Sequence, residues 1–211
     1  LESVDMVGTS TKEDVLERAQ EAVRQVPKGT WIRGRGWDQN DWPEIQYPNA
    51  KDLDAISEIH PMIFRRIDGH AAWANSFAMK IAGISKDTKD VDGGIILRDD
   101  AGNPTGIFID NALDLIEVKI PPSTKDDIQR QIKNAQKLLN KLGLTSIHDA
   151  GTSKEEIAVM KEMISSGDLS LRIFTMLHNN PDDYEPFLET GPETENPFIK
   201  VRSVKIYMDG A

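Results

Sequence analysis

The sequence predicts an α/β fold, and two observations lead to this class. In the second half of the chain, apolar stripes at helical spacing alternate with short apolar runs. Strands that alternate with helices are typical of βαβ units with a parallel sheet. In the first half the runs are shorter and include a hairpin signal. We therefore divide the chain into residues 1–122, with mixed α+β structure, and residues 123–211, with βα units.

The first half begins with a helix. Ser10-Thr11-Lys12-Glu13 is a capping-box signal, and apolar residues follow it at helical spacing until Pro27. Thr30 to Trp37 then has the composition of a strand. The other expected elements are a strand over 61–68, a helix over 71–81 closed by Gly83, hairpin strands over 95–99 and 105–110, and a short helix over 111–118.

The second half has a regular alternation of helix and strand. Ser123 opens a long amphipathic helix, which Gly143 ends. The remaining expected elements are a strand over 144–147 that ends at His148-Asp149, a helix capped by Ser153 and Glu156, a strand over 169–177, a Pro-rich stretch over 181–197 and a strand over 201–208.

Composition narrows the classes of partner. The 211 residues carry 25 Lys+Arg against 35 Asp+Glu, a net charge of −10. We expect no nucleic-acid or membrane partner, because nucleic acids and anionic membrane surfaces bind proteins that carry clustered positive charge. The chain has no cysteine, which excludes disulfides and thiolate zinc sites. No apolar run approaches the roughly 20 residues of a membrane span. The sequence leaves the compartment open: a cytoplasmic protein is favoured, and an exported form is not excluded.

Polar residues gather where the expected parallel strands end. His148 and Asp149 follow one strand, His178 follows the next, and Lys205 and Asp209 belong to the last. Functional side chains of parallel α/β proteins collect at the C-terminal ends of strands. These residues therefore form one candidate site. Polar residues also mark many strand ends that have no function, so this alternative stays open.

Lys205 is the most informative of these residues. Val204, Ile206 and Met208 would share one face of a strand, while Lys205 would lie on the other. Parallel strands are normally covered on both faces, so Lys205 would point into an interior. Burial lowers the pKa of a lysine and makes its amine nucleophilic. Such an amine can react with carbon dioxide to form a carbamate that binds metal. The alternative is an exposed lysine at a sheet edge.

His70 and the tryptophans are candidates for a substrate pocket. His70 lies in Asp68-Gly69-His70-Ala71, at an expected turn between a strand and a helix, where an imidazole could contact substrate, relay a proton or bind metal. The alternative is a histidine that caps the next helix. Trp37 could line a pocket for an apolar substrate, and the alternative is packing in the core.

The metal-ligand motifs are incomplete in this sequence. It contains neither HxH nor HExxH, and its four histidines are His60, His70, His148 and His178. A two-metal site needs several histidine and aspartate ligands. The chain does not obviously supply them all.

Five sequence blocks together resemble one known family. They are Trp31-Ile32-Arg33-Gly34-Arg35-Gly36-Trp37-Asp38, the stretch from Arg66 to Ser76, the stretch from Asp92 to Gly106, Gly143 to Gly151, and Val204-Lys205-Ile206-Tyr207-Met208-Asp209-Gly210-Ala211. Their content and order are similar to the amidohydrolase-3 (YtcJ-like) branch of the metal-dependent amidohydrolase superfamily. The blocks cover nearly the whole chain.

The resemblance implies a partial, distorted TIM (β/α)8 barrel of the metal-dependent hydrolase type. Residues 1–122 would be a large α+β insert, or lid, between the first and second barrel strands. Residues 123–211 would provide strands two to four. We expect the chain to be an internal piece of a longer enzyme. The HxH motif would precede Leu1, and the later metal histidines and the catalytic aspartate would follow Ala211.

The resemblance also implies roles for single residues. Lys205 would be a carbamylated metal ligand, and His148 and Asp149 would support the metal ligands. The remaining expected substrate-binding residues are His70, Asp68, Asn75 and Trp37. The cofactor would be one or two divalent ions, with zinc favoured, and metal-activated water would cleave the C–N bond of a small amide-type substrate.

Two other classes stay open. One is a non-catalytic binding or regulatory protein that keeps the amidohydrolase fold. In the other, these 211 residues in isolation form a structural domain without activity, which we expect of them. The full protein could also form a homo-oligomer.

Overall fold

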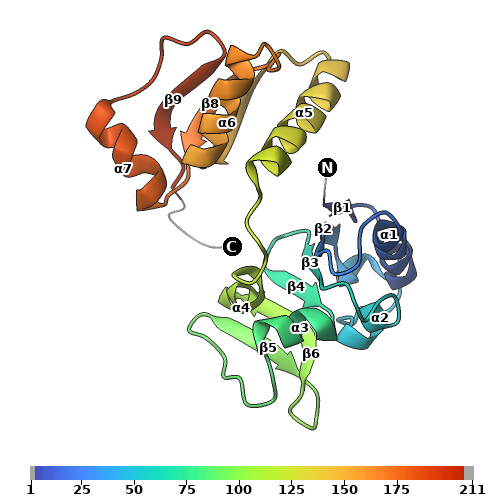
Figure 1. The fold of residues 1–211 in the computed structure, drawn as a ribbon. Coiled ribbons are helices and arrows are strands. Elements are labelled where there is room, and N and C mark those ends of the chain that lie inside the picture. Colours follow the sequence, from blue (N-terminus) through green and yellow to red (C-terminus); the bar gives the residue numbers. More distant parts are fainter. Residues whose placement is uncertain (1–2, 207–211) are drawn as a thin grey trace. The chain divides into compact units, whose positions relative to one another are not determined.

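The computed structural model describes residues 3–206. The chain forms two compact units, Leu1–Pro121 and Pro122–Ala211, and Figure 1 shows the elements of each. Both units combine helices with β-sheet, so the chain has an α/β fold. Among the helices of residues 3–206, none combines the length and the apolar character needed to cross a bilayer.

The first unit is built on a mixed six-stranded sheet with the order β1-β2-β3-β4-β6-β5. The first three strands in this order are parallel, and the others pair antiparallel. The strands are β1 (Val4–Asp5), β2 (Ile32–Trp37), β3 (Met62–Arg66), β4 (Ala71–Ala74), β5 (Gly94–Arg98) and β6 (Pro104–Asp110). The helices are α1 (Lys12–Arg24), η1 (Gln39–Asp41), α2 (Ala50–Asp54), α3 (Ser76–Ala82), η2 (Asn111–Leu113) and α4 (Asp114–Glu117).

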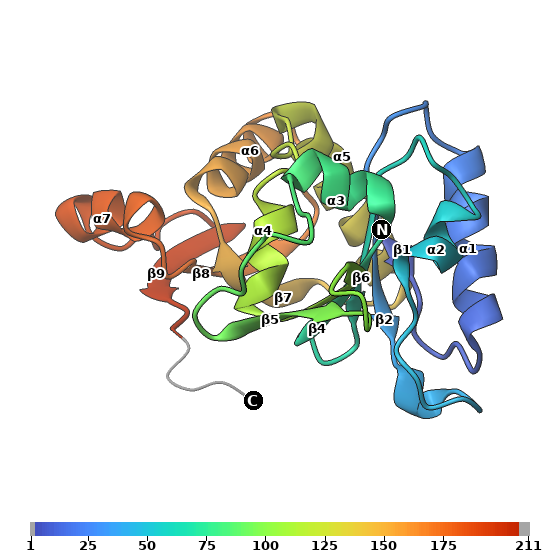
Figure 2. The ribbon, with the colours of Figure 1, turned by 90° about the horizontal axis from the view of Figure 1, so that it is seen from below.

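The predicted helix over 71–81 is wrong in its first part, which is strand β4. Its four residues are buried and alternate between two core clusters: Ala71 and Trp73 pack in one, Ala72 and Ala74 in the other. The α1 side chains Val15 and Ala19 belong to the first cluster, and side chains of α3 and α4 belong to the second. Figure 2 shows α3 and α4 together over the sheet. Burial on both faces and pairing with β3 and β6 override the helix propensity of alanine.

Capping explains where the long helices begin, one residue later than the sequence predicted. Thr11, not Ser10, caps α1, and its partner is Asp14. Thr124, not Ser123, caps the first helix of the second unit, with Asp127 as partner. In both cases the aspartate three residues after the threonine accepts the backbone N–H of the cap. This reciprocal pair satisfies two backbone donors, which fixes the start of each helix.

The second unit has a three-stranded parallel sheet in the order β7-β8-β9, as the alternation of helix and strand predicted. The strands are β7 (Ser146–Thr152), β8 (Arg172–Leu177) and β9 (Ile199–Val204). The helices are α5 (Lys125–Lys141), α6 (Lys154–Ser165) and α7 (Pro181–Thr190). Apolar residues of these helices pack with alternate residues of β8 and β9 in a single core. The described strands do not close a barrel.

Three predictions in this unit are wrong in detail. The strand expected over 144–147 runs on to Thr152, so His148 and Asp149 lie within β7 rather than beyond its end. The Pro-rich stretch contains helix α7, because Asn180 caps it and Pro181 stands in its first turn, where a missing N–H is harmless. The predicted strand over 201–208 starts earlier and ends at Val204. Tyr207, Met208 and Asp209 lie outside the described residues.

Candidate functional site

His178 and Lys205 directly follow the C-terminal ends of the neighbouring strands β8 and β9. They therefore lie next to each other at the C-terminal edge of the sheet. The backbone N–H of His178 donates to the carbonyl of Thr152 at 3.1 Å, and that of Lys205 donates to the carbonyl of Leu177 at 2.9 Å. Both residues therefore continue the hydrogen-bond pattern of the sheet. His178 is exposed and Lys205 is half-buried. This edge is where parallel α/β proteins place functional groups.

Gly151 makes room for His178 at this edge. A Cβ atom on Gly151 would lie 3.2 Å from Cε1 of the His178 ring, and the backbone φ of Gly151 is 122°. A side chain here would be strained by its backbone and crowded by the imidazole. The glycine is therefore required for the observed position of the His178 ring. Sequence analysis gave His178 only as a strand-end residue and assigned no role to Gly151 beyond the family resemblance.

His148 lies on the more exposed face of the same sheet, in a stack that spans all three strands. Its ring stacks on Phe174 of β8 with centroids 4.9 Å apart, and the guanidinium of Arg202 of β9 lies 5.0 Å from the centre of the Phe174 ring. Asp149 is the next residue of β7 and is half-buried. Sequence analysis did not single out Phe174 or Arg202, because the strand register that brings them together is not visible in one sequence.

The described residues do not make a complete metal centre. Nowhere in residues 3–206 do three or more His, Cys, Asp or Glu side chains form a group that could hold an ion. Buried hydroxyl groups of Thr152 and Ser203 have no hydrogen-bond partner in this part of the chain. A hydroxyl is a weaker ligand than an imidazole or carboxylate, so these groups do not replace the missing ligands.

In the first unit, His70 lies in the turn between β3 and β4, not between a strand and a helix. Asp68 holds this turn: it accepts the backbone N–H of His70 at 3.0 Å and forms a two-pronged ion pair with Arg66. The hydrogen bonds from Arg66, and then from the His70 backbone, lower the pKa of Asp68. Arg66 also donates to the hydroxyl of Tyr47 at 2.8 Å. The turn is thus fixed by charge-assisted hydrogen bonds.

The imidazole of His70 pairs with a carboxylate that sequence analysis missed. Nδ1 of His70 is 2.7 Å from Oδ1 of Asp110, at the end of β6. The backbone N–H of Asp110 also donates to the carbonyl of His70, at 3.0 Å. Asp110 has φ 48° and is the one non-glycine residue with a positive φ among those described. Such a backbone costs about 1–3 kcal/mol and is often found at functional sites.

Asn75 and Trp37 are internal to the first unit. The side-chain oxygen of Asn75 accepts from the backbone of Met62 and Ala78, and its amide donates to the carbonyls of Ser57 and His60. Trp37 is 0% exposed, and its indole N–H donates to the carbonyl of Phe64 at 2.7 Å. The burial of Trp37 favours packing over pocket lining, and Asn75 caps α3.

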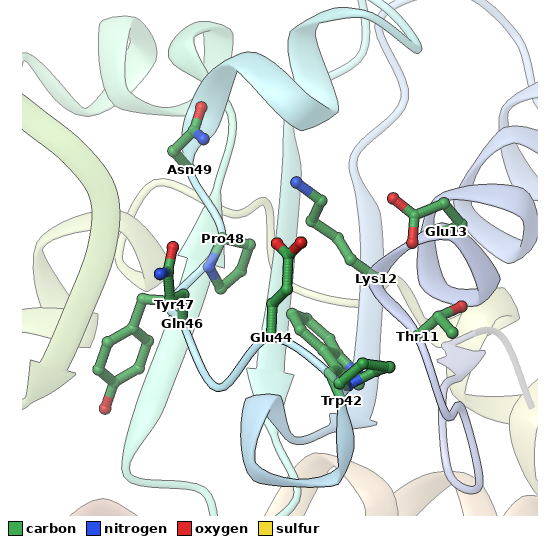
Figure 3. Close-up of a pocket in the computed structure, with 10 residues that line it drawn as sticks. Thr11, Lys12, Glu13, Trp42, Glu44, Gln46, Tyr47, Pro48 and Asn49 are labelled. Atoms are coloured by element: carbon green, nitrogen blue, oxygen red, sulfur yellow. The ribbon is translucent and has the colours of Figure 1, made fainter.

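A separate cavity of about 250 Å³ lies between the start of α1 and the loop before α2 (Figure 3). Its charged lining residues are Lys12, Glu13 and Glu44. The Lys12 ammonium is already paired with Asp52 at 2.9 Å. The cavity therefore offers mainly carboxylates, together with Trp42, whose buried indole N–H has no hydrogen-bond partner within residues 3–206.

The comparisons with known proteins identify the family. The protein-family model described as the amidohydrolase family matches residues 3–211. The chain belongs to the amidohydrolase family. YtcJ of Bacillus subtilis (strain 168), which is named as an amidohydrolase, is 32% identical over 99% of this chain. The resemblance read from the sequence is therefore confirmed.

Two further proteins are similar to this chain. The N-substituted formamide deformylase of Arthrobacter pascens is 26% identical over 96% of the chain. A crystal structure of an uncharacterized metal-dependent hydrolase from Pyrococcus horikoshii matches all of the chain, with 26% identity and a TM-score of 0.71. The chain spans about 40% of the length of YtcJ, 39% of the deformylase and 40% of the Pyrococcus protein.

Proposed function

We propose that the complete protein containing these residues hydrolyses amide-type C–N bonds of small molecules with the help of a divalent metal. The observation that carries this proposal is the family match over residues 3–211, in a chain whose parallel sheet presents Lys205 at its C-terminal edge. The deformylase relative supports an amide substrate, and the Pyrococcus relative supports a metal. The fold alone would not decide the reaction.

Lys205 is our proposed metal ligand in this chain, after its amine has formed a carbamate. An ammonium group cannot bind a cation, whereas a carbamate offers anionic oxygens. Because residues 3–206 contain no group of three acidic or imidazole ligands, they supply at most part of the ligand set. We propose zinc, one or two ions per chain, held by Lys205 and by ligands outside these residues. A bound ion would supply Lewis acidity.

We propose further that the second unit provides strands two to four of a (β/α)8 barrel, and the first unit an insert that carries His70 towards substrate. Two facts support this role of His70. Its side chain is 35% exposed, and its Nε2 has no hydrogen-bond partner within residues 3–206. We propose that His148 and Asp149 support the metal ligands from β7.

Hydrolysis of simple N-formyl and N-acyl amines by the complete protein tests this function. Protein stripped of metal with a chelator and then resupplied with zinc, manganese or buffer would be assayed for release of the free amine. We expect turnover with metal and at least a tenfold loss without it. A folded, metal-supplied protein that hydrolyses none of these amides would contradict the proposal and favour a binding or regulatory protein. Residues 1–211 alone are expected to be inactive.

A further inference from the structure

The pair formed by His70 and Asp110 has a geometry that defines which nitrogen of the ring can act. We infer that Asp110 is a positioning residue: it holds His70 in the Nδ1–H tautomer, so that Nε2 presents a lone pair to an N–H group of the substrate. The nature of the target rests on the proposed amide hydrolysis. The tautomer itself does not.

The tautomer follows from the chemistry of the contact. An ionised carboxylate has only acceptor sites, so a 2.7 Å contact between Asp110 Oδ1 and His70 Nδ1 requires the hydrogen on Nδ1. A neutral imidazole carries one N–H, and Nε2 is then an acceptor. A free histidine side chain prefers the opposite tautomer. The carboxylate therefore changes which nitrogen donates and which accepts.

The backbone holds both partners in place. The N–H of His70 donates to Asp68, and its carbonyl accepts the N–H of Asp110. The antiparallel register that pairs Ala71 with Ile109 brings the start of β4 next to the end of β6. Every polar group of His70 except Nε2 is thus engaged. A fixed acceptor binds a hydrogen-bond donor, and the N–H group of an amide substrate, which rests on the proposed function, is such a donor.

The backbone of Asp110 supports a positioning role. With φ 48° and ψ −127°, Asp110 adopts a conformation that glycine reaches without strain. A glycine would satisfy this backbone, but it would lack the carboxylate. A side chain kept in a strained conformation is expected where that side chain has a function.

The first test is the tautomer itself, measured on the complete protein. Nitrogen-15 spectra of histidine-labelled protein at about pH 8.5, where an ordinary imidazole is neutral, separate N–H nitrogens from acceptor nitrogens. A His70→Gln variant assigns the signals. We expect Nδ1–H in the wild type and a shift to mainly Nε2–H in Asp110→Gly. The control is Asp100→Asn, which removes an exposed carboxylate of the same unit and should change nothing.

Stability separates this role from a purely structural one. Because glycine relieves the strained backbone, we expect Asp110→Gly to melt at the same temperature as the wild type or higher. Wild-type His70 in the Nε2–H form, or an unchanged tautomer in Asp110→Gly, would overturn the inference. A lower melting temperature of Asp110→Gly would overturn the argument from strain.

The second test concerns the target of Nε2. With an amide that the complete protein hydrolyses, kcat/KM would be compared between the N–H compound and its N-methyl analogue. We expect the wild type to prefer the N–H compound, and Asp110→Gly and His70→Gln to lose roughly tenfold or more of that preference. An unchanged preference in both variants would overturn the role towards substrate. If no amide is hydrolysed, the proposed function and this role fail together, whereas the tautomer is still decided by the spectra.

Discussion

At the residue scale, buried polar groups of the first unit are tied to specific partners. Asn75 is 0% exposed, and its side chain joins β3, the start of α3 and the loop before β3 through four hydrogen bonds. The family resemblance of the sequence implied a substrate-binding role for this residue. The hydrogen bonds instead account for its burial, because a buried amide needs partners for both of its ends.

Replacing Asn75 by alanine should destabilise the first unit by about 2–3 kcal/mol, because buried backbone and carbonyl groups lose their partners. Urea unfolding, followed by tryptophan fluorescence, measures this loss. The control is Asn40→Ala, an exposed asparagine with local hydrogen bonds, for which we expect a change within about 0.5 kcal/mol. Equal effects of the two substitutions would contradict the role of Asn75.

One residue of the candidate site could be predicted from the sequence, and its partner could not. His70 stands out because a histidine follows Asp-Gly at a turn. Its partner Asp110 is 40 residues further along the chain, and no motif joins the two. Only the pairing of β4 with β6 brings them together. Contacts that depend on strand register stay hidden until the register is known.

At the element scale, local signals predicted most helices and strands, and tertiary packing decided the rest. The hairpin of β5 and β6 and the capping of α6 by Ser153 follow from turn and cap residues alone. Strand β4 could not be predicted in this way. An alanine-rich run favours a helix unless neighbouring strands pair with it on both sides. Helix α7 was missed because Pro181 and Pro186 stand within it, and proline usually argues against a helix.

The start of α5 gives a prediction about pH. The hydroxyl of Thr124, its backbone N–H and then Arg130 lower the pKa of Asp127 to about 2. Because this folded pKa is below the unfolded value of about 3.9, the carboxylate stabilises the helix above about pH 4 and loses that effect as the pH falls through 2. Amide protection in the first turn of α5 should decline over this range, as measured by hydrogen exchange.

Two adjacent hydroxyls provide the matched pair for this prediction. Thr124→Ala removes the cap and should raise the Asp127 pKa and weaken the helix start by about 1 kcal/mol. Ser123→Ala removes the neighbouring hydroxyl, which does not cap, and should leave both unchanged. Titration of the Asp127 carboxyl by NMR distinguishes them. A larger effect of Ser123→Ala would contradict the cap at Thr124 and would mean that the helix begins at Ser123, as the sequence predicted.

At the scale of the whole molecule, the sheet of the second unit has unequal faces. On β8, Ile173, Thr175 and Leu177 are buried, whereas Phe174 and Met176 on the other face are only half-buried. Parallel sheets are normally covered on both faces. The open face is consistent with our proposal that these strands belong to a larger barrel, in which Lys205 would stand at the C-terminal rim with His178.

Metal content shows whether this chain supplies Lys205 as a ligand to a metal-dependent amidohydrolase, as we propose. The complete protein, produced with zinc and bicarbonate, would be compared with Lys205→Ala and with a control, Lys133→Ala, which removes a lysine of a surface ion pair. We predict one or two metal ions per chain in the wild type and the control, and a clear loss in Lys205→Ala with the fold intact. A wild-type protein without metal, or equal metal in all three, would contradict the account.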